Sequence, residues 1–268
     1  METKVFAQLG GTRAGYTRPA LARTWSGRVS ILAGLGLLSA CAGSETGNAQ
    51  LERPEQPVSI ALAFAGAEPG GPSSTSADGL VITAEAGTAW VDSLELGLAS
   101  GEVCSDDLAL AEELGAFFHP RCDDGDTLVI EGPWVVDLVT GQFEPPLEGI
   151  SLPEVALAEV RVKLKGRDES PALEVLGSVG DREFELSVKG SVPAKFSDEA
   201  PVLVDDGLGR LILDLGFESW FGELEVVPCV EAPGRPAGPV DLTGPGCGSV
   251  EQSVRNQLVR GNLRSLPR

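Results

Sequence analysis

AEVRVKLK, residues Ala158–Lys165, is the stretch that decides the fold. Apolar and charged side chains alternate along it, which is the period of a β-strand whose two faces meet different surroundings. A sheet with one solvated face is typical of antiparallel rather than doubly wound architecture. We expect the core face of this strand to carry Ala158, Val160, Val162 and Leu164.

Further strand patterns lie on both sides of this stretch. Gly and Pro together supply 53 of 268 residues, which favours frequent turns over long helices. The sequence therefore predicts an all-β fold, an antiparallel β-sandwich of roughly eight to ten strands. The other predicted strands are Val58–Phe64, Leu80–Ala84, Ala89–Leu98, Thr127–Val139, Leu173–Val179, Phe184–Val188 and Leu211–Phe217.

Two segments favour helix instead. Asp106–Phe118 (DDLALAEELGAFF) predicts a short helical excursion from the sheet. Near the C-terminus, Ser249–Gln252 fits a capping box, and Val250, Val254 and Leu258 share one helical face. A short C-terminal helix is expected there.

A short apolar run near the N-terminus, Val29–Cys41 (VSILAGLGLLSAC), follows a flank that carries four arginines. This is the pattern of a secretory signal, and the run is shorter than the roughly 20 apolar residues that span a membrane. Its end, Leu38-Ser39-Ala40-Cys41, resembles the lipobox of bacterial lipoproteins. The resemblance implies cleavage before Cys41 and acylation of that residue. The alternatives are an ordinary cleaved signal, with Cys41 as a bystander, and a buried core helix.

The predicted cleavage divides the chain by charge. After residue 40 it holds 15 Lys/Arg and 39 Asp/Glu, a net charge of −24, which repels nucleic acid and anionic lipid. Membrane contact is therefore expected through the lipid anchor, and no nucleic-acid partner is expected. Ala42 after the cysteine, rather than Asp, favours the outer membrane, with the domain on its periplasmic or surface side.

The sequence predicts four parts of the chain. They are a signal peptide (1–40), a lipidated tether (41–57), a β-sandwich domain (58–227) and a disulfide-held C-terminal extension (228–268).

Four cysteines remain after Cys41, an even number that predicts disulfides in an exported protein. Two local pairs enclose the same 18-residue interval. Of the three connectivities, the preferred one joins Cys104 to Cys122 and Cys229 to Cys247. Zinc binding by four thiolates is disfavoured because no Cys-x-x-Cys is present.

The middle of the chain resembles a transthyretin-like sandwich family of bacterial exported lipoproteins. The resemblance rests on Trp134-Val135-Val136-Asp137-Leu138, then Leu152-Pro153 and the strand that follows, over residues 56–227. In that family a "VDL" strand precedes "LP" and an amphipathic strand, but the usual Gly-Tyr after "LP" is replaced here by Glu154-Val155. Members are mostly uncharacterised, so the resemblance implies a fold and no activity.

No catalytic motif emerges from the sequence. His119 is the single histidine, and the chain has no Gly-x-Ser-x-Gly, His-Glu-x-x-His or phosphate loop. The 39 acids supply many carboxylate pairs, so an acidic-residue hydrolase is a distant alternative. Trp90, Trp134 and Trp220 fall at expected core positions, which argues against an aromatic sugar platform.

Calcium is the best-motivated ion, although no cofactor is required by the sequence. Asp123, Asp124 and Asp126 surround Gly125, and Asp205-Asp206-Gly207 forms a second cluster. Asp-Gly is also a favoured turn dipeptide, and a turn is the preferred interpretation of both clusters.

The leading hypothesis is a non-enzymatic envelope lipoprotein whose β-sandwich binds or scaffolds a protein or glycan. The alternative is a calcium-assisted carbohydrate- or protein-binding adhesion module.

Overall fold

The computed structural model describes residues 56–64, 71–101, 104, 121–123, 125–147, 150–152, 154–232, 234 and 238–268. These residues belong to one compact unit, Gln50–Arg268. The predicted helical excursion at Asp106–Phe118 lies outside the described residues.

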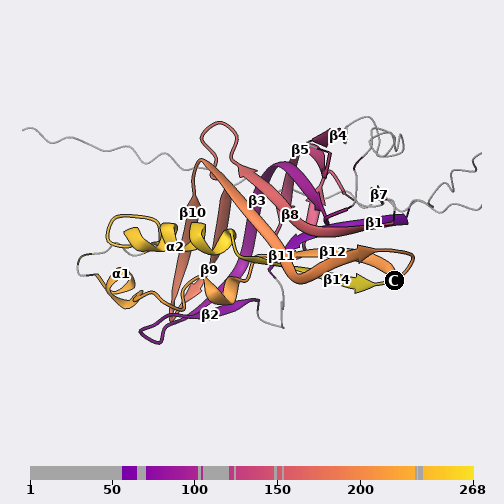
Figure 1. Ribbon diagram of the computed structural model, residues 1–268. Helices are drawn as coiled ribbons and strands as arrows, with labels where there is room; N and C mark the ends of the chain where they lie inside the picture. Colours follow the sequence, from indigo (N-terminus) through magenta and orange to yellow (C-terminus); the bar gives the residue numbers. More distant parts are fainter. Residues whose placement is uncertain are drawn as a thin grey trace, which may run out of the picture. The chain divides into compact units, whose positions relative to one another are not determined.

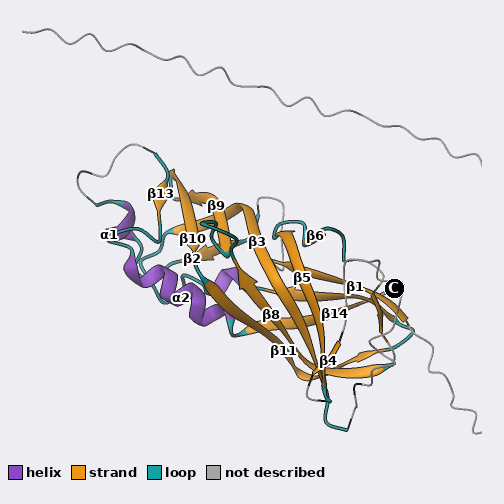
Figure 2. Ribbon diagram, turned by 90° about the horizontal axis from the view of Figure 1, so that it is seen from above, coloured by secondary structure: helices purple, strands orange, loops and turns teal. Residues whose placement is uncertain are grey.

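Strands form more than half of the described chain and helices only a small part, which confirms the all-β prediction (Figure 1). The strands are β1 Gln56–Ala63, β2 Ser73–Thr75, β3 Val81–Leu98, β4 Arg121–Asp123, β5 Thr127–Asp137, β6 Gln142–Glu144, β7 Ile150–Leu152, β8 Val155–Lys165, β9 Leu173–Val179, β10 Arg182–Val188, β11 Ser191–Val204, β12 Leu208–Asp214, β13 Val240–Asp241 and β14 Gly261–Pro267. The helices are the 3-10 helix η1 Phe217–Ser219, α1 Val227–Val230 and α2 Gly248–Leu258. Both α-helices lie toward the part of the sheet that holds β10 and β13 (Figure 2).

All fourteen strands join in one mixed sheet, with the main order β13-β10-β9-β3-β8-β11-β14-β12-β1-β7. Most pairings are antiparallel, as expected. Three are parallel, which corrects the expectation of a purely antiparallel sheet: β1 with β12, β10 with β13, and β11 with β14. Parallel neighbours need a long connection. Here most of the chain separates β1 from β12, and α2 lies between β11 and β14 in the sequence.

The long strand β3 organises the sheet. Thr88 pairs with Asp137 of β5 on one edge and with Glu174 of β9 on the other. One edge of β3 pairs with β9 over residues 82–89 and with β8 over residues 91–98. The strands β9 and β8 therefore lie one after the other along the same edge of β3. A single 18-residue strand thus connects the two halves of the sheet.

Bulges shift the inward-facing positions relative to a strict alternation. In β8, Val160, Val162 and Leu164 are buried as predicted, but Ala158 is only half-buried because the register with β3 shifts beside it. In β3, the register shifts between Val91 and Ser93. Trp90, predicted at a core position, is therefore half-buried on the face opposite the buried Leu94 and Leu96, so that prediction is wrong. A bulge adds one residue to one strand and so changes which face later residues occupy.

The predicted C-terminal helix is confirmed as α2, although its start differs. It begins at Gly248 after Cys247, and no side chain caps it, so the capping box predicted at Ser249 is wrong. Val250, Val254 and Leu258 are buried, and the helix packs against β10 and β11. After α2 the chain enters β14, which pairs with β11 and β12 inside the sheet.

Candidate functional site

The two predicted disulfides are present in the structure. Cys104 pairs with Cys122 and Cys229 with Cys247, with Cα–Cα distances of 5.7 Å and 5.0 Å. Cys41 and His119 lie outside the described residues. No helix in the described ranges combines the length and hydrophobicity that membrane crossing requires.

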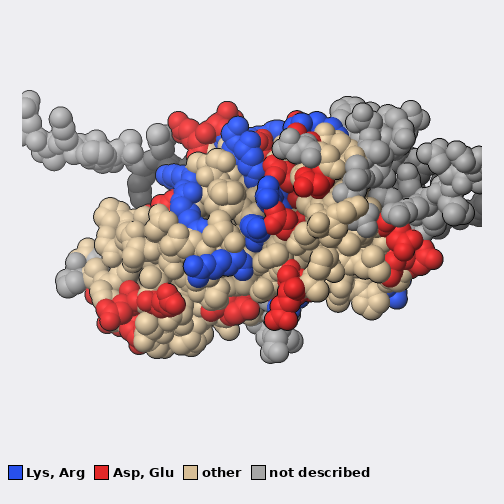
Figure 3. Space-filling view, viewed as in Figure 1, with Lys and Arg blue, Asp and Glu red and all other residues tan. Residues whose placement is uncertain are grey.

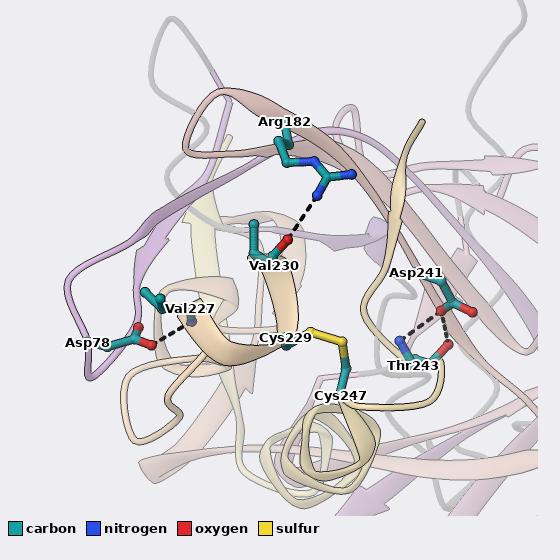
Figure 4. Close-up of a disulfide and its surroundings, with 8 residues drawn as sticks. All are labelled: Asp78, Arg182, Val227, Cys229, Val230, Asp241, Thr243 and Cys247. Atoms are coloured by element: carbon teal, nitrogen blue, oxygen red, sulfur yellow. Dashed lines mark hydrogen bonds between the residues drawn. A yellow bond between two sulfur atoms is a disulfide. The ribbon is translucent and has the colours of Figure 1, made fainter. Parts of the chain in front are cut away.

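The second disulfide links α1 to the residue that precedes α2, and hydrogen bonds brace this region (Figure 4). Arg182 Nη1 donates to the carbonyl of Val230 at 2.9 Å, and the amide of Val227 donates to Asp78 Oδ2 at 2.6 Å. Burial raises the pKa of Asp78, but hydrogen bonds from Ser76 and Val227 outweigh it, so the net effect lowers that pKa. The disulfide and these hydrogen bonds hold together segments that lie far apart in the sequence.

The acidic clusters form turns in the part of the chain that is described. Asp205 Oδ1 accepts a hydrogen bond from the amide of Gly207 at 2.8 Å, which matches the turn interpretation. Asp123 and Asp126 are exposed, and Asp124 lies outside the described residues. No group of three His, Cys, Asp or Glu side chains arranged to hold a metal was found within the described ranges. Calcium binding at Asp123, Asp124 and Asp126 therefore stays a prediction.

A polar cleft lies where β1 and β12 meet the segment that begins at the β5–β6 turn. Ser59 on β1 and Arg210 on β12 are register partners, so their side chains lie side by side. Both are half-buried, whereas Ile60 and Leu211, one residue further along each strand, are buried in the core. The pairing thus places a hydroxyl and a guanidinium on the face opposite the core.

The β5–β6 turn is held in place above this face. Asp137 Oδ1 accepts hydrogen bonds from the amides of Val139 and Thr140 at 2.9 and 3.0 Å, and the Gly141 amide donates to the Asp137 carbonyl at 2.7 Å. Gly141 has φ +71°, a conformation that glycine adopts at little cost. A Cβ there would lie 3.1 Å from the methyl carbons of Ala61 and Ala63, so the turn packs closely on β1.

The resulting cleft has a volume of about 280 Å³. The guanidinium of Arg210 has no hydrogen-bond or ion-pair partner among the described residues. Its chemistry suits binding of an oxygen-rich anion and supplies no nucleophile or general base. The lining residues are Ser59, Ile60, Gly141, Gln142, Phe143, Pro146, Leu147 and Arg210.

A second charged region lies on the outer face of β8, where Lys and Arg side chains form a band in Figure 3. Most are neutralised by carboxylates: Lys163 Nζ lies 2.9 Å from Asp92 Oδ2, and both Arg161 and Lys195 contact Glu159. The Lys195 hydrogen bond lowers the pKa of Glu159 against the opposing effect of burial. Hydrogen bonding between Lys163 and Asp92 lowers the pKa of Asp92 and raises that of Lys163. These pairs stabilise the strands and leave the Arg210 cleft as the better candidate binding site.

Sequence reasoning missed this cleft because its parts lie far apart in the chain. Ser59, Gln142 and Arg210 carry no shared motif, and the one local signal is an arginine inside the apolar strand that contains Leu211. Comparisons with protein-family models, curated proteins and solved structures gave no match.

Proposed function

We propose that the protein is a lipid-anchored protein of the bacterial cell envelope whose β domain serves a non-enzymatic binding or scaffolding role. The observation that carries the proposal is Leu38-Ser39-Ala40-Cys41 at the end of a signal-like run. Two further features agree with it. Both disulfides suit an oxidising compartment, and the acidic chain after residue 40 suits a soluble domain held by lipid.

The anchor and the domain have separate tasks in this proposal. Two or three acyl chains at Cys41 hold a protein stably at a membrane, because each buried methylene contributes about 0.8 kcal/mol. The outer membrane is the proposed location, with the domain on its periplasmic or surface side. A protein or glycan is the proposed class of partner, and the Arg210 cleft is the best-defined place for part of it to bind.

Metabolic labelling tests the anchor directly. The full chain is expressed in a bacterial host fed an alkyne analogue of palmitate, beside a Cys41→Ser variant. We expect label and membrane fractionation for the natural chain, and loss of both in the variant. Ser44→Ala is the matched control, because it changes another small residue close to Cys41 and leaves the cysteine and both disulfides in place. An unlabelled natural chain that is secreted and cleaved would contradict lipidation.

A further inference from the structure

We propose that the Arg210 cleft binds a small carboxylate-bearing ligand of about monosaccharide size. The inference deepens the proposed binding role and rests on it. The ligand would bind to residues of the β domain alone, and the lipid anchor would not contribute to its binding.

The charge of Arg210 lies at a half-buried position. Three cations of the described chain are half-buried: Arg182, Arg210 and Arg255. Arg182 donates to the carbonyls of Val230 and Gly238, and Arg255 is paired with Glu251 at 2.8 Å. Arg210 alone of the three has no acceptor among the described residues. A partly desolvated guanidinium without a counter-charge is stabilised when an anion binds it.

A guanidinium presents a planar fork of donors that matches the two oxygens of a carboxylate. The chain carries a net charge of −24 after residue 40, so a singly charged ligand meets less repulsion than a doubly charged phosphate. A carboxylate is therefore favoured over a phosphate.

Beside Arg210, the Ser59 hydroxyl donates to the carbonyl of Gly209 at 3.3 Å and can still accept a hydrogen bond. The Gln142 side-chain amide can donate and accept, and Phe143, Pro146 and Leu147 supply apolar surface. The volume of about 280 Å³ lies just below the roughly 300–1,000 Å³ of ordinary small-molecule sites. A single sugar ring or a compact hydroxy acid fits that size and that mixture of groups.

The test uses calorimetry on the purified full-length mature protein in detergent, with glucuronate as the probe. Glucose serves as the neutral comparison and inorganic phosphate as the doubly charged one. We expect saturable glucuronate binding with a Kd on the order of 1 mM, as for one charge-assisted pair in an open cleft, and weaker binding of the other two. Arg210→Gln should weaken glucuronate binding about tenfold or more. Arg260→Gln removes the same charge from an exposed residue and should change nothing.

Two further variants keep the test decisive if Arg210→Gln does not fold. Arg210→Lys keeps the charge but loses the planar fork, so we expect a partial loss of affinity. Gln142→Ala alters the opposite wall and should weaken binding of glucuronate. The inference is overturned if glucuronate does not bind at about 20 mM, or if it binds equally well to all the variants. Because lipidation is measured separately at Cys41, failure here would leave the anchor proposal standing.

Discussion

The carboxylate of Asp214 on β12 is fully buried, and its Oδ2 atom lies 2.8 Å from Nη2 of Arg264 on β14. The other oxygen, Oδ1, accepts a hydrogen bond from the amide of Gly216 at 2.8 Å. Arg264 belongs to the last strand of the chain, which pairs with β12 in antiparallel register. The ion pair therefore fixes the C-terminal strand to the middle of the sheet.

Arg264→Met should destabilise the fold more than Asp214→Asn. The first variant leaves a buried carboxylate without its cation, which we expect to cost about 2 kcal/mol because half of the arginine side chain is exposed to water. The second leaves an exposed arginine and keeps the hydrogen bond from Gly216, so its cost should be smaller. Urea unfolding of both variants measures the difference, and the reverse order would contradict the argument.

Glu159→Gln should reduce stability at neutral pH and have little effect in acid. Lys195 lowers the pKa of Glu159 in the folded protein, and Arg161 adds to that effect against opposing burial. A carboxyl with a depressed folded pKa stabilises the fold above its unfolded pKa, and this contribution disappears as the pH falls through the folded pKa. We expect a loss of about 1 kcal/mol at pH 7, because both cations are partly exposed.

Urea unfolding at several pH values measures this effect. The wild-type and Glu159→Gln curves should converge as the solution becomes acidic. Glu199→Gln is the control, because Glu199 is exposed and has no ion pair among the described residues. A difference that stays constant across pH would show that the Glu159 ion pairs are not its source.

Losing the second disulfide should cost more stability than losing the first. Both enclose the same sequence separation, so each cross-link restricts the unfolded chain by a similar amount, about 3 kcal/mol. Cys229 and Cys247 are also both buried, whereas Cys122 is half-buried on β4. Serine at both buried positions adds a cost of burying two hydroxyls.

The comparison uses the double variants Cys229→Ser/Cys247→Ser and Cys104→Ser/Cys122→Ser, unfolded in guanidinium. A larger drop in unfolding free energy is expected for the first pair. Equal drops would mean that the cross-links act through the unfolded chain alone.

The sequence predicted the parts of this fold that depend on local periodicity. The alternation of apolar Val160, Val162 and Leu164 with charged residues correctly predicted a strand. The helical spacing of Val250, Val254 and Leu258 correctly predicted the helix α2. Equal cysteine intervals predicted both disulfides.

Features that depend on pairing between distant strands were not predictable in the same way. The orientation of Trp90 depends on a bulge opposite β5, which a single sequence does not reveal. The strand β14 has just two buried residues, Gly261 and Leu263, so its pattern is too weak to predict a place inside the sheet. The cleft likewise requires β1 to pair with β12, more than half the chain away.

Gly141→Ala should damage the cleft as well as the fold. The residue has φ +71°, which strains any side chain, and a Cβ would crowd Ala61 and Ala63 and lie 3.6 Å from Nη2 of Arg210. Gly125→Ala is the matched control, since Gly125 has φ +76° and no atom of the described residues lies within 4 Å of an added Cβ. The control should lose about 1 kcal/mol of unfolding free energy from backbone strain alone, and Gly141→Ala should lose more.

Glucuronate affinity should fall for Gly141→Ala and stay unchanged for the control, because the turn that carries Gly141 forms one wall of the cleft. Equal stability losses would show that the turn can move away from β1 without cost, and the cleft would then not be a preorganised site.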